Sequence, residues 1–254
     1  MDFKEKTQTK LTSPIWLIGG LLVVSTQVAA DLIAEGRGVY DTQLNVTWTQ
    51  DANLLATMEN GNPDLISQII AANNGVINDT PNGFDTPPDS GVYNLSAADF
   101  SSGGATSWWG AQAFVGYLNS IDYDGSAQWR LPYTPADATL FGDLTGNELG
   151  ELYYGELGGP TGYNNNTVFS NTNTPNLVYW SETEYTADYL AAWAFSISSS
   201  DGFQAYYGKA GPFYTWAVSP GNVSTPIPLP SAVWQFAAAL LGLCGLHRNR
   251  VARR

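Results

Sequence analysis

The feature that most constrains the fold is the placement of cysteine. The chain has one cysteine, Cys244, and one histidine, His247, and both lie near its C-terminal end. Residues 31–221 therefore contain no disulfide, and the packing of apolar side chains has to hold them together. The chain has nine Trp, 14 Tyr and 10 Phe, most of them in this segment, which is enough to build one well-buried domain.

The same absence excludes several classes of enzyme. Serine and cysteine catalytic triads need a histidine, and zinc hydrolases need histidine or cysteine ligands, so residues 31–221 can carry neither. Three basic residues and 21 acidic residues lie between 31 and 221, so the net charge is 3 − 21 = −18. A domain this acidic repels nucleic acid, and we expect no nucleic-acid partner.

The N-terminal segment has the pattern of an export signal. Three lysines precede an apolar run over residues 15–24, and the small residues Val28-Ala29-Ala30 follow it. This order predicts a signal peptide over residues 1–30, cleaved by signal peptidase after Val28 to Ala30. An uncleaved N-terminal anchor is the alternative.

Residues 222–254 contain a short proline motif, an apolar run and a basic end. They are Pro228-Leu229-Pro230, residues 232–246, and Arg248, Arg250, Arg253 and Arg254. The run predicts a short transmembrane helix, and the arginines favour a cytoplasmic C-terminus with the preceding domain on the far side of the membrane.

This order resembles the PEP-CTERM sorting signal in its Pro-Leu-Pro variant. The resemblance implies recognition and cleavage by an exosortase, after transient anchoring in the inner membrane. The expected final location is the cell surface or the extracellular space. A permanent tail anchor, which predicts the same sidedness, is the alternative.

The pattern of apolar residues in the first half predicts mainly helices. A hairpin is expected from Gly38 to Trp48, followed by short helices that begin near Asp51 and at Asn62-Pro63. Residues 74–107 are rich in Asn, Gly, Pro, Asp and Ser and predict a long irregular connection. Ser107 is expected to cap a helix over residues 108–118.

The second half changes from helices to strands. Thr134 to Asp137 predict a capped helical turn that ends at Gly142, and a further helix is expected over residues 147–157. Four strands are expected near residues 178–181, 191–197, 203–207 and 214–218. The whole pattern predicts an α+β domain over residues 31–221 with an antiparallel sheet, flanking helices and long loops, whose two ends can meet.

Three motifs occur in an order that is typical of one family. They are Gln128-Trp129-Arg130-Leu131-Pro132-Tyr133-Thr134, Val178-Tyr179-Trp180-Ser181-Glu182-Thr183 and Tyr214-Thr215-Trp216-Ala217-Val218. They resemble the Lcl C-terminal-like domain, a family of unknown function that is similar to C-type-lectin-like folds. The resemblance implies that fold and a surface role. The chain departs from the family pattern at Glu182, at Ala217-Val218 and in the long loop over residues 74–107.

Arg130 lies between two apolar residues of the first motif. In an extended segment Trp129 and Leu131 point to one side and Arg130 to the other, so we expect Trp129 and Leu131 in the core. Arg130 is expected to form a structural ion pair with one of the many carboxylates. A ligand-binding arginine is the alternative.

Other candidate sites rest on composition. Asp122 and Asp124 alternate like part of a calcium loop, so a loose calcium site is one hypothesis and a turn role the other. The adjacent acid pairs could serve a glycan hydrolase; they are Asp122 and Asp124, Glu148 and Glu151, and Glu182 and Glu184. The aromatic and amide residues of a candidate sugar-binding surface are Tyr163, Asn164, Asn165, Tyr206 and Tyr207.

These observations lead to one main hypothesis and two alternatives. We expect an exported, exosortase-processed, non-enzymatic domain at the cell surface or in the extracellular matrix, without a cofactor unless calcium binds. Its partners would be an exopolysaccharide or a surface protein. The alternatives are a carboxylate-dependent glycan hydrolase and a matrix component without a specific ligand.

Overall fold

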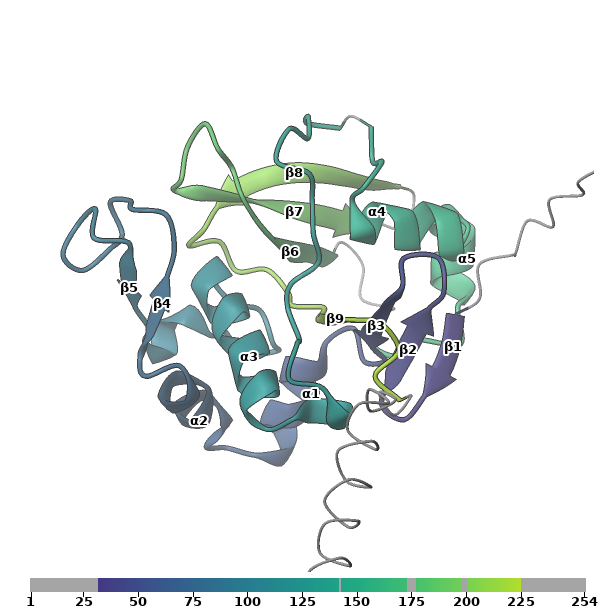
Figure 1. The fold of residues 1–254 in the computed structure, drawn as a ribbon, viewed down its shortest axis with the longest axis horizontal. Coiled ribbons are helices and arrows are strands. Elements are labelled where there is room, and N and C mark those ends of the chain that lie inside the picture. The colour runs from purple at the N-terminus through teal and green to yellow at the C-terminus, as the bar shows by residue number, and fades with distance from the viewer. Residues whose placement is uncertain (1–31, 142, 173–176, 198–200, 225–254) are drawn as a thin grey trace, which may run out of the picture.

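The computed structural model describes residues 32–141, 143–172, 177–197 and 201–224, which form a mixed α+β structure with antiparallel sheets (Figure 1). The predicted terminal hydrophobic helices and the processing motifs lie outside these residues. Those motifs are Val28 to Ala30, Pro228 to Pro230, Arg248 and Arg250. Within the described ranges, no helix is both long enough and apolar enough to span a membrane.

The first sheet joins the two ends of the described domain. It contains β1 (Leu32–Glu35), β2 (Gly38–Asp41), β3 (Val46–Thr49) and β9 (Val218–Pro220), in the order β1-β2-β3-β9, with antiparallel neighbours. The hairpin predicted from Gly38 is β2 and β3, and it is confirmed. Because β9 pairs with β3, the expectation that the two ends meet is also confirmed.

The predicted irregular connection over residues 74–107 is wrong in part. It contains a two-stranded ribbon, β4 (Val76–Asn78) with β5 (Val92–Asn94), and the short 3₁₀ helix η1 (Ala97–Asp99). Tyr93 of β5 stacks on Trp109 with ring centroids 3.9 Å apart. Strands of three residues are too short for alternation to be visible in the sequence, and this tertiary contact supports the ribbon.

Three helices form one side of the structure. They are α1 (Leu54–Gly61), α2 (Leu65–Ala72) and α3 (Trp108–Ser120). The prediction for α3 is confirmed, since the Ser107 hydroxyl accepts a hydrogen bond from the Gly110 N–H and caps the helix. A short 3₁₀ helix, η2 (Tyr123–Gly125), follows α3.

The helical turn predicted from Thr134 to Gly142 is wrong. Residues 134–141 form turns and irregular chain, and residue 142 lies outside the described ranges. Thr134 is buried and bonds to neighbours far along the chain: its carbonyl accepts from the Thr183 hydroxyl, and its own hydroxyl accepts from the Asn147 side chain. These long-range bonds replace the local capping bonds on which the prediction depended.

The helix predicted over residues 147–157 is confirmed. Asn147 caps α4 (Glu148–Glu151), which continues as the π-helical turn η3 (Leu152–Glu156), and α5 (Gly159–Asn165) follows. The second sheet has the order β6-β7-β8, with β6 (Leu177–Glu184), β7 (Ala191–Ile197) and β8 (Gly202–Gly208) antiparallel. The predicted fourth strand, residues 214–218, is not an antiparallel strand of this sheet: Tyr214 makes an isolated parallel bridge to Tyr179 of β6, and the segment then leads into β9 of the first sheet.

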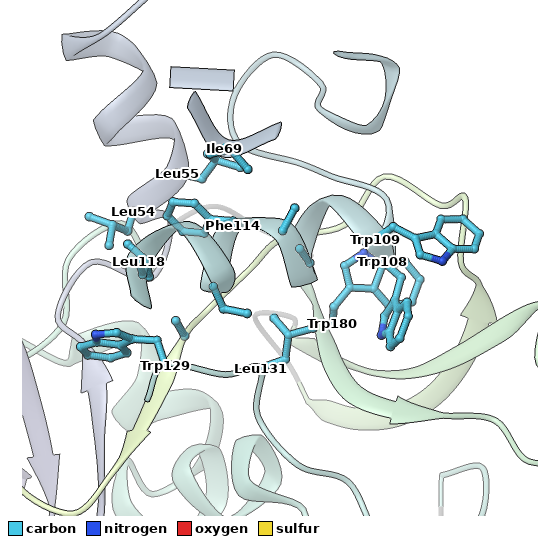
Figure 2. Close-up of a cluster of buried hydrophobic side chains, with 14 of the residues drawn as sticks. Leu54, Leu55, Ile69, Trp108, Trp109, Phe114, Leu118, Trp129, Leu131 and Trp180 are labelled. Atoms are coloured by element: carbon cyan, nitrogen blue, oxygen red, sulfur yellow. The ribbon is translucent and has the colours of Figure 1, made fainter. Parts of the chain in front are cut away.

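Both faces of the β6-β7-β8 sheet contribute to the core, and the central strand β7 is buried along its whole length. Trp180, Ala192 and Ala194 face a core that includes α1, α2 and α3, whereas Tyr179 and Phe195 face Tyr153 of η3. Figure 2 shows Phe114 and Leu118 of α3 between the side chains of Leu54 and Leu55 and the segment that carries Trp129 and Leu131. Large aromatic side chains on both faces supply the core that replaces disulfides.

Candidate functional site

The Trp129-Arg130-Leu131 segment runs beside β9 and joins it through an isolated antiparallel bridge between Arg130 and Val218. The Arg130 N–H donates to the Val218 carbonyl over 2.8 Å, and the Val218 N–H donates back over 2.9 Å. Trp129 and Leu131 are buried, and Arg130 points away from them, as predicted. Pairing with β9 therefore determines the direction of all three side chains.

Arg130 forms a two-pronged ion pair with Glu148, the first residue of α4. Nη1 lies 2.7 Å from Oε2 and Nη2 lies 2.7 Å from Oε1. The Tyr133 N–H also donates to Oε2 over 2.7 Å. The predicted structural ion pair is confirmed, and both carboxylate oxygens of Glu148 are occupied by donors from the 130–133 segment.

Glu182 is the second carboxylate near this arginine. Burial raises the pKa of Glu182, the positive charge of Arg130 opposes that rise, and the negative charge of Glu148 adds to it. The two acids that meet around Arg130 therefore come from α4 and β6. The acid pairs expected from the sequence are Glu148 with Glu151 and Glu182 with Glu184. The two acids that lie near Arg130 are one member of each of those pairs.

An open pocket of about 510 Å³ lies between the end of α2, strand β4 and the start of α3. Its lining contains no charged residue, although the domain is strongly acidic. The lining residues are Ala72, Asn73, Asn74, Val76, Ile77, Asn78, Trp108 and Gln112. The pocket combines several amide groups with an indole.

One side-chain amide of the pocket is engaged within the fold, and three others have no hydrogen bond to described residues. The Asn73 side chain donates to the carbonyls of Ile69 and Ala113, each over 2.8 Å, and so ties α2 to α3. The side-chain amides of Asn74, Asn78 and Gln112 make no hydrogen bond to other described residues. Three amides can therefore donate to and accept from a bound molecule.

A buried cluster of charges surrounds Lys209, and the rings of Trp108 and Trp109 lie beside it. The Lys209 side chain has no exposed surface, and its Nζ lies 2.6 Å from Asp79 Oδ2 and 2.5 Å from Glu184 Oε1. Nζ is also 4.5 Å from the ring centre of Trp108 and 5.6 Å from that of Trp109. One cation is thus enclosed by two carboxylates and two indole rings.

The predicted calcium residues lie in a turn. Asp122 and Asp124 both have positive φ, and the Asp124 carboxylate accepts a hydrogen bond from the Arg37 N–H over 3.0 Å. Among the residues that the structure describes, no group of three or more His, Cys, Asp or Glu could hold a metal ion. Calcium binding stays a prediction, and the observed contacts are those of a turn.

The predicted sugar-binding surface does not form as one patch. Tyr163 is 3 % exposed and belongs to the core beside Tyr153, because α5 packs against η3. Tyr206 is exposed and stacks on Tyr185, with ring centroids 3.8 Å apart. Tyr207 packs instead against Phe213, since successive residues of β8 point to opposite faces. Asn164 and Asn165 lie at the exposed end of α5.

The remaining motif residues are structural. Tyr179 and Trp180 are fully buried on β6, and the Trp180 indole donates to the Thr106 carbonyl. The Ser181 carbonyl accepts from the Trp108 indole, and the Pro132 carbonyl accepts from the Glu182 N–H. The two motifs therefore lie side by side and connect β6 to α3 and to the 130–133 segment.

Sequence reasoning missed the amide pocket and the partners of Lys209. The pocket residues lie on three elements, and Asp79 lies in a region expected to be irregular. The one available signal was composition, since Lys209 is the single lysine between residues 31 and 224. A lone lysine on an apolar background is a candidate for burial with a partner.

Comparison with known families identifies the chain. Residues 37–219 match the model of the Lcl C-terminal domain. No curated protein matches the chain, and no solved structure matches it. Because the matched range covers most of the sequence, the chain belongs to the Lcl C-terminal domain family.

Proposed function

We propose that this protein is a non-enzymatic surface or extracellular-matrix domain with a C-type-lectin-like fold that binds neutral polysaccharide. The observation that carries the proposal is the uncharged, amide-lined pocket beside Trp108. Amides donate to and accept from sugar hydroxyls, so an uncharged pocket lined by them suits a hydroxyl-rich ligand.

The charge of the domain favours a neutral ligand. The net charge of −18 over residues 31–221 repels anionic and sulfated polysaccharides. The pocket residues Asn74, Asn78 and Gln112 offer both donors and acceptors without a charge. A neutral, hydroxyl-rich polymer meets both conditions.

Export and processing are part of the same proposal. The signal-peptide pattern over residues 1–30 and the Pro-Leu-Pro, apolar and arginine order over residues 222–254 support transport across the inner membrane and cleavage by an exosortase. Cell fractionation, with mass spectrometry of the mature C-terminus, tests this part. Intact chains in the cytosol would contradict it.

The ligand proposal is tested with an array of neutral glycans, probed with and without calcium. Asn78→Ala and Gln112→Ala, combined in one variant, should weaken binding about 30-fold if each removes a hydrogen bond worth about 1 kcal/mol. Asn60→Ala, at an exposed asparagine of α1, is the matched control and should bind like the unmodified protein. Equal binding by the double variant would place the ligand elsewhere.

A second function is favoured by one observation. Glu148 and Glu182 meet around Arg130, and burial raises the pKa of Glu182, as general acids of glycosidases require. Sugar release from secreted polysaccharide, lost in Glu182→Gln and retained in the surface control Asp137→Asn, would support a hydrolase. Absence of both binding and sugar release would favour a matrix component without a specific ligand.

A further inference from the structure

We propose that Lys209 and Asp79 become joined by an amide bond that forms inside the folded domain, with Glu184 as the proton carrier. The two residues are 130 positions apart, and the Lys209 amine contacts an Asp79 carboxylate oxygen at 2.6 Å. Neither side chain has exposed surface. The link would be a covalent cross-link in a domain that contains no cysteine, and it does not depend on the proposed ligand.

The fold supplies the proximity that the reaction needs. Asp79 follows β4, Glu184 ends β6 and Lys209 follows β8, so three separate elements hold the groups together. Reacting groups held in contact have a very high effective concentration, and burial keeps bulk water away from the amide that forms. The Trp108 and Trp109 rings form the apolar wall beside the amine.

The reaction balances without an oxidant or a co-reactant. Lys209 Nζ, after losing a proton, attacks the Asp79 carboxyl carbon, and a carbon–nitrogen bond forms. One carboxyl oxygen then leaves together with two of the three ammonium protons, as water. An ammonium and a carboxylate are thereby converted into a neutral amide, which removes two buried charges.

The surroundings of Asp79 distinguish its two oxygens. Oδ2 accepts hydrogen bonds from the Trp109 indole over 2.9 Å and from the Asn82 side chain over 3.0 Å. Oδ1 is buried and has no hydrogen-bond partner among the described residues. In the product, Oδ2 is the amide carbonyl and keeps its two donors, whereas the unpartnered Oδ1 is the oxygen that departs.

Glu184 is placed to carry the protons. Its Oε1 lies 2.5 Å from Lys209 Nζ, and the Thr80 hydroxyl donates to its Oε2 over 2.5 Å, which holds the carboxylate in position. The Glu184 side chain is 19 % exposed, in contrast to the fully buried Lys209 and Asp79. It can therefore take a proton from the amine and exchange protons with solvent.

The test is the mass of the purified, folded full chain and of its tryptic peptides. The chain should be lighter than its sequence by one water molecule. After denaturation and digestion, the peptide of residues 38–130 should remain attached to the peptide that begins at residue 131, with no cleavage at Lys209. Cooperative thermal unfolding of the same sample shows that it is folded.

Four variants make the result specific. Lys209→Arg keeps the cation and Asp79→Ala removes the carboxyl group; both should have their full mass and release separate peptides. Asp79→Asn should form the same amide with loss of ammonia in place of water. Glu184→Gln should slow the appearance of the link at least tenfold during refolding. If the chain without substitutions is folded, has its full mass and releases a free peptide that ends at Lys209, the proposal is overturned.

Discussion

The guanidinium of Arg130 and the carboxylate of Glu148 meet through two parallel hydrogen bonds, each 2.7 Å long. The pair joins the extended 129–132 segment to the first residue of α4. Because the same segment bonds to Val218 of β9 and to Glu182 of β6, three elements converge at the family motif. The arginine of that motif is therefore a structural junction.

Removal of the arginine should destabilise the domain. Arg130→Ala leaves the largely buried carboxylate of Glu148 without its cation. The Arg130 and Glu148 side chains keep 29 % and 13 % of their surface exposed, so we expect a loss of about 2 kcal/mol, below the full cost at a completely buried site. Urea unfolding measures it. Arg130→Lys should lose about half as much, because lysine cannot make both bonds. Unchanged stability in Arg130→Ala would contradict the junction role.

Glu182 should give the domain a measurable pH dependence. Its pKa is raised by burial and lies above the ordinary value of 4.5, so between the two values the folded chain binds more protons than the unfolded chain. Stability must therefore fall as pH rises through that window. The Glu182→Gln variant has no charge to bury at this position. Its free energy of unfolding, relative to that of the unmodified protein, should therefore increase from pH 4 to pH 7.

Urea unfolding across that pH range measures the Glu182 effect. Asp41, whose pKa burial also raises, is present in both proteins, so the difference between them isolates residue 182. Asp137→Asn, at an exposed acid, is the control and should follow the unmodified protein. A difference that stays constant with pH would rule out a raised pKa at Glu182.

Trp180 should be among the largest contributors to the core. It is fully buried, its ring lies 4.9 Å from that of Phe213, and its indole donates to the Thr106 carbonyl. Trp180→Ala should cost about 4 kcal/mol, as large-to-small changes in a core do. Trp180→Phe keeps ring packing and should cost about half as much. Chemical unfolding measures both losses. A loss below about 1 kcal/mol for Trp180→Ala would contradict the prediction and would show that the core closes around the space left by the indole.

Ligand binding at the amide pocket should be insensitive to salt. No charged residue lines the pocket, so screening has nothing there to weaken, and the affinity for a neutral glycan should change less than about twofold between 0.05 M and 0.5 M salt. Calorimetric titration at both salt concentrations measures this. A steep fall in affinity with salt would indicate that charged groups outside the pocket bind the ligand.

Local signals predicted the elements whose stabilising contacts are themselves local. Ser107 and Asn147 cap α3 and α4 as their positions indicate, and the alternation of Trp193, Phe195 and Ile197 marks β7. The β4-β5 ribbon was missed, since three-residue strands show no pattern. Thr134 has the pattern of a helix cap, but it serves as a bridge between β6 and α4.

The sequence by itself determined an α+β domain with an aromatic core, an acidic surface, no catalytic histidine or cysteine between residues 31 and 221, and an arginine destined for an ion pair. Only the tertiary structure decided the partners: Glu148 for Arg130, Asp79 and Glu184 for Lys209, and separate elements for the amide pocket. The physical reason is the separation along the chain of the groups that meet. Spacing along the chain relates side chains within a turn or a strand, whereas groups 130 residues apart meet only when whole elements pack together.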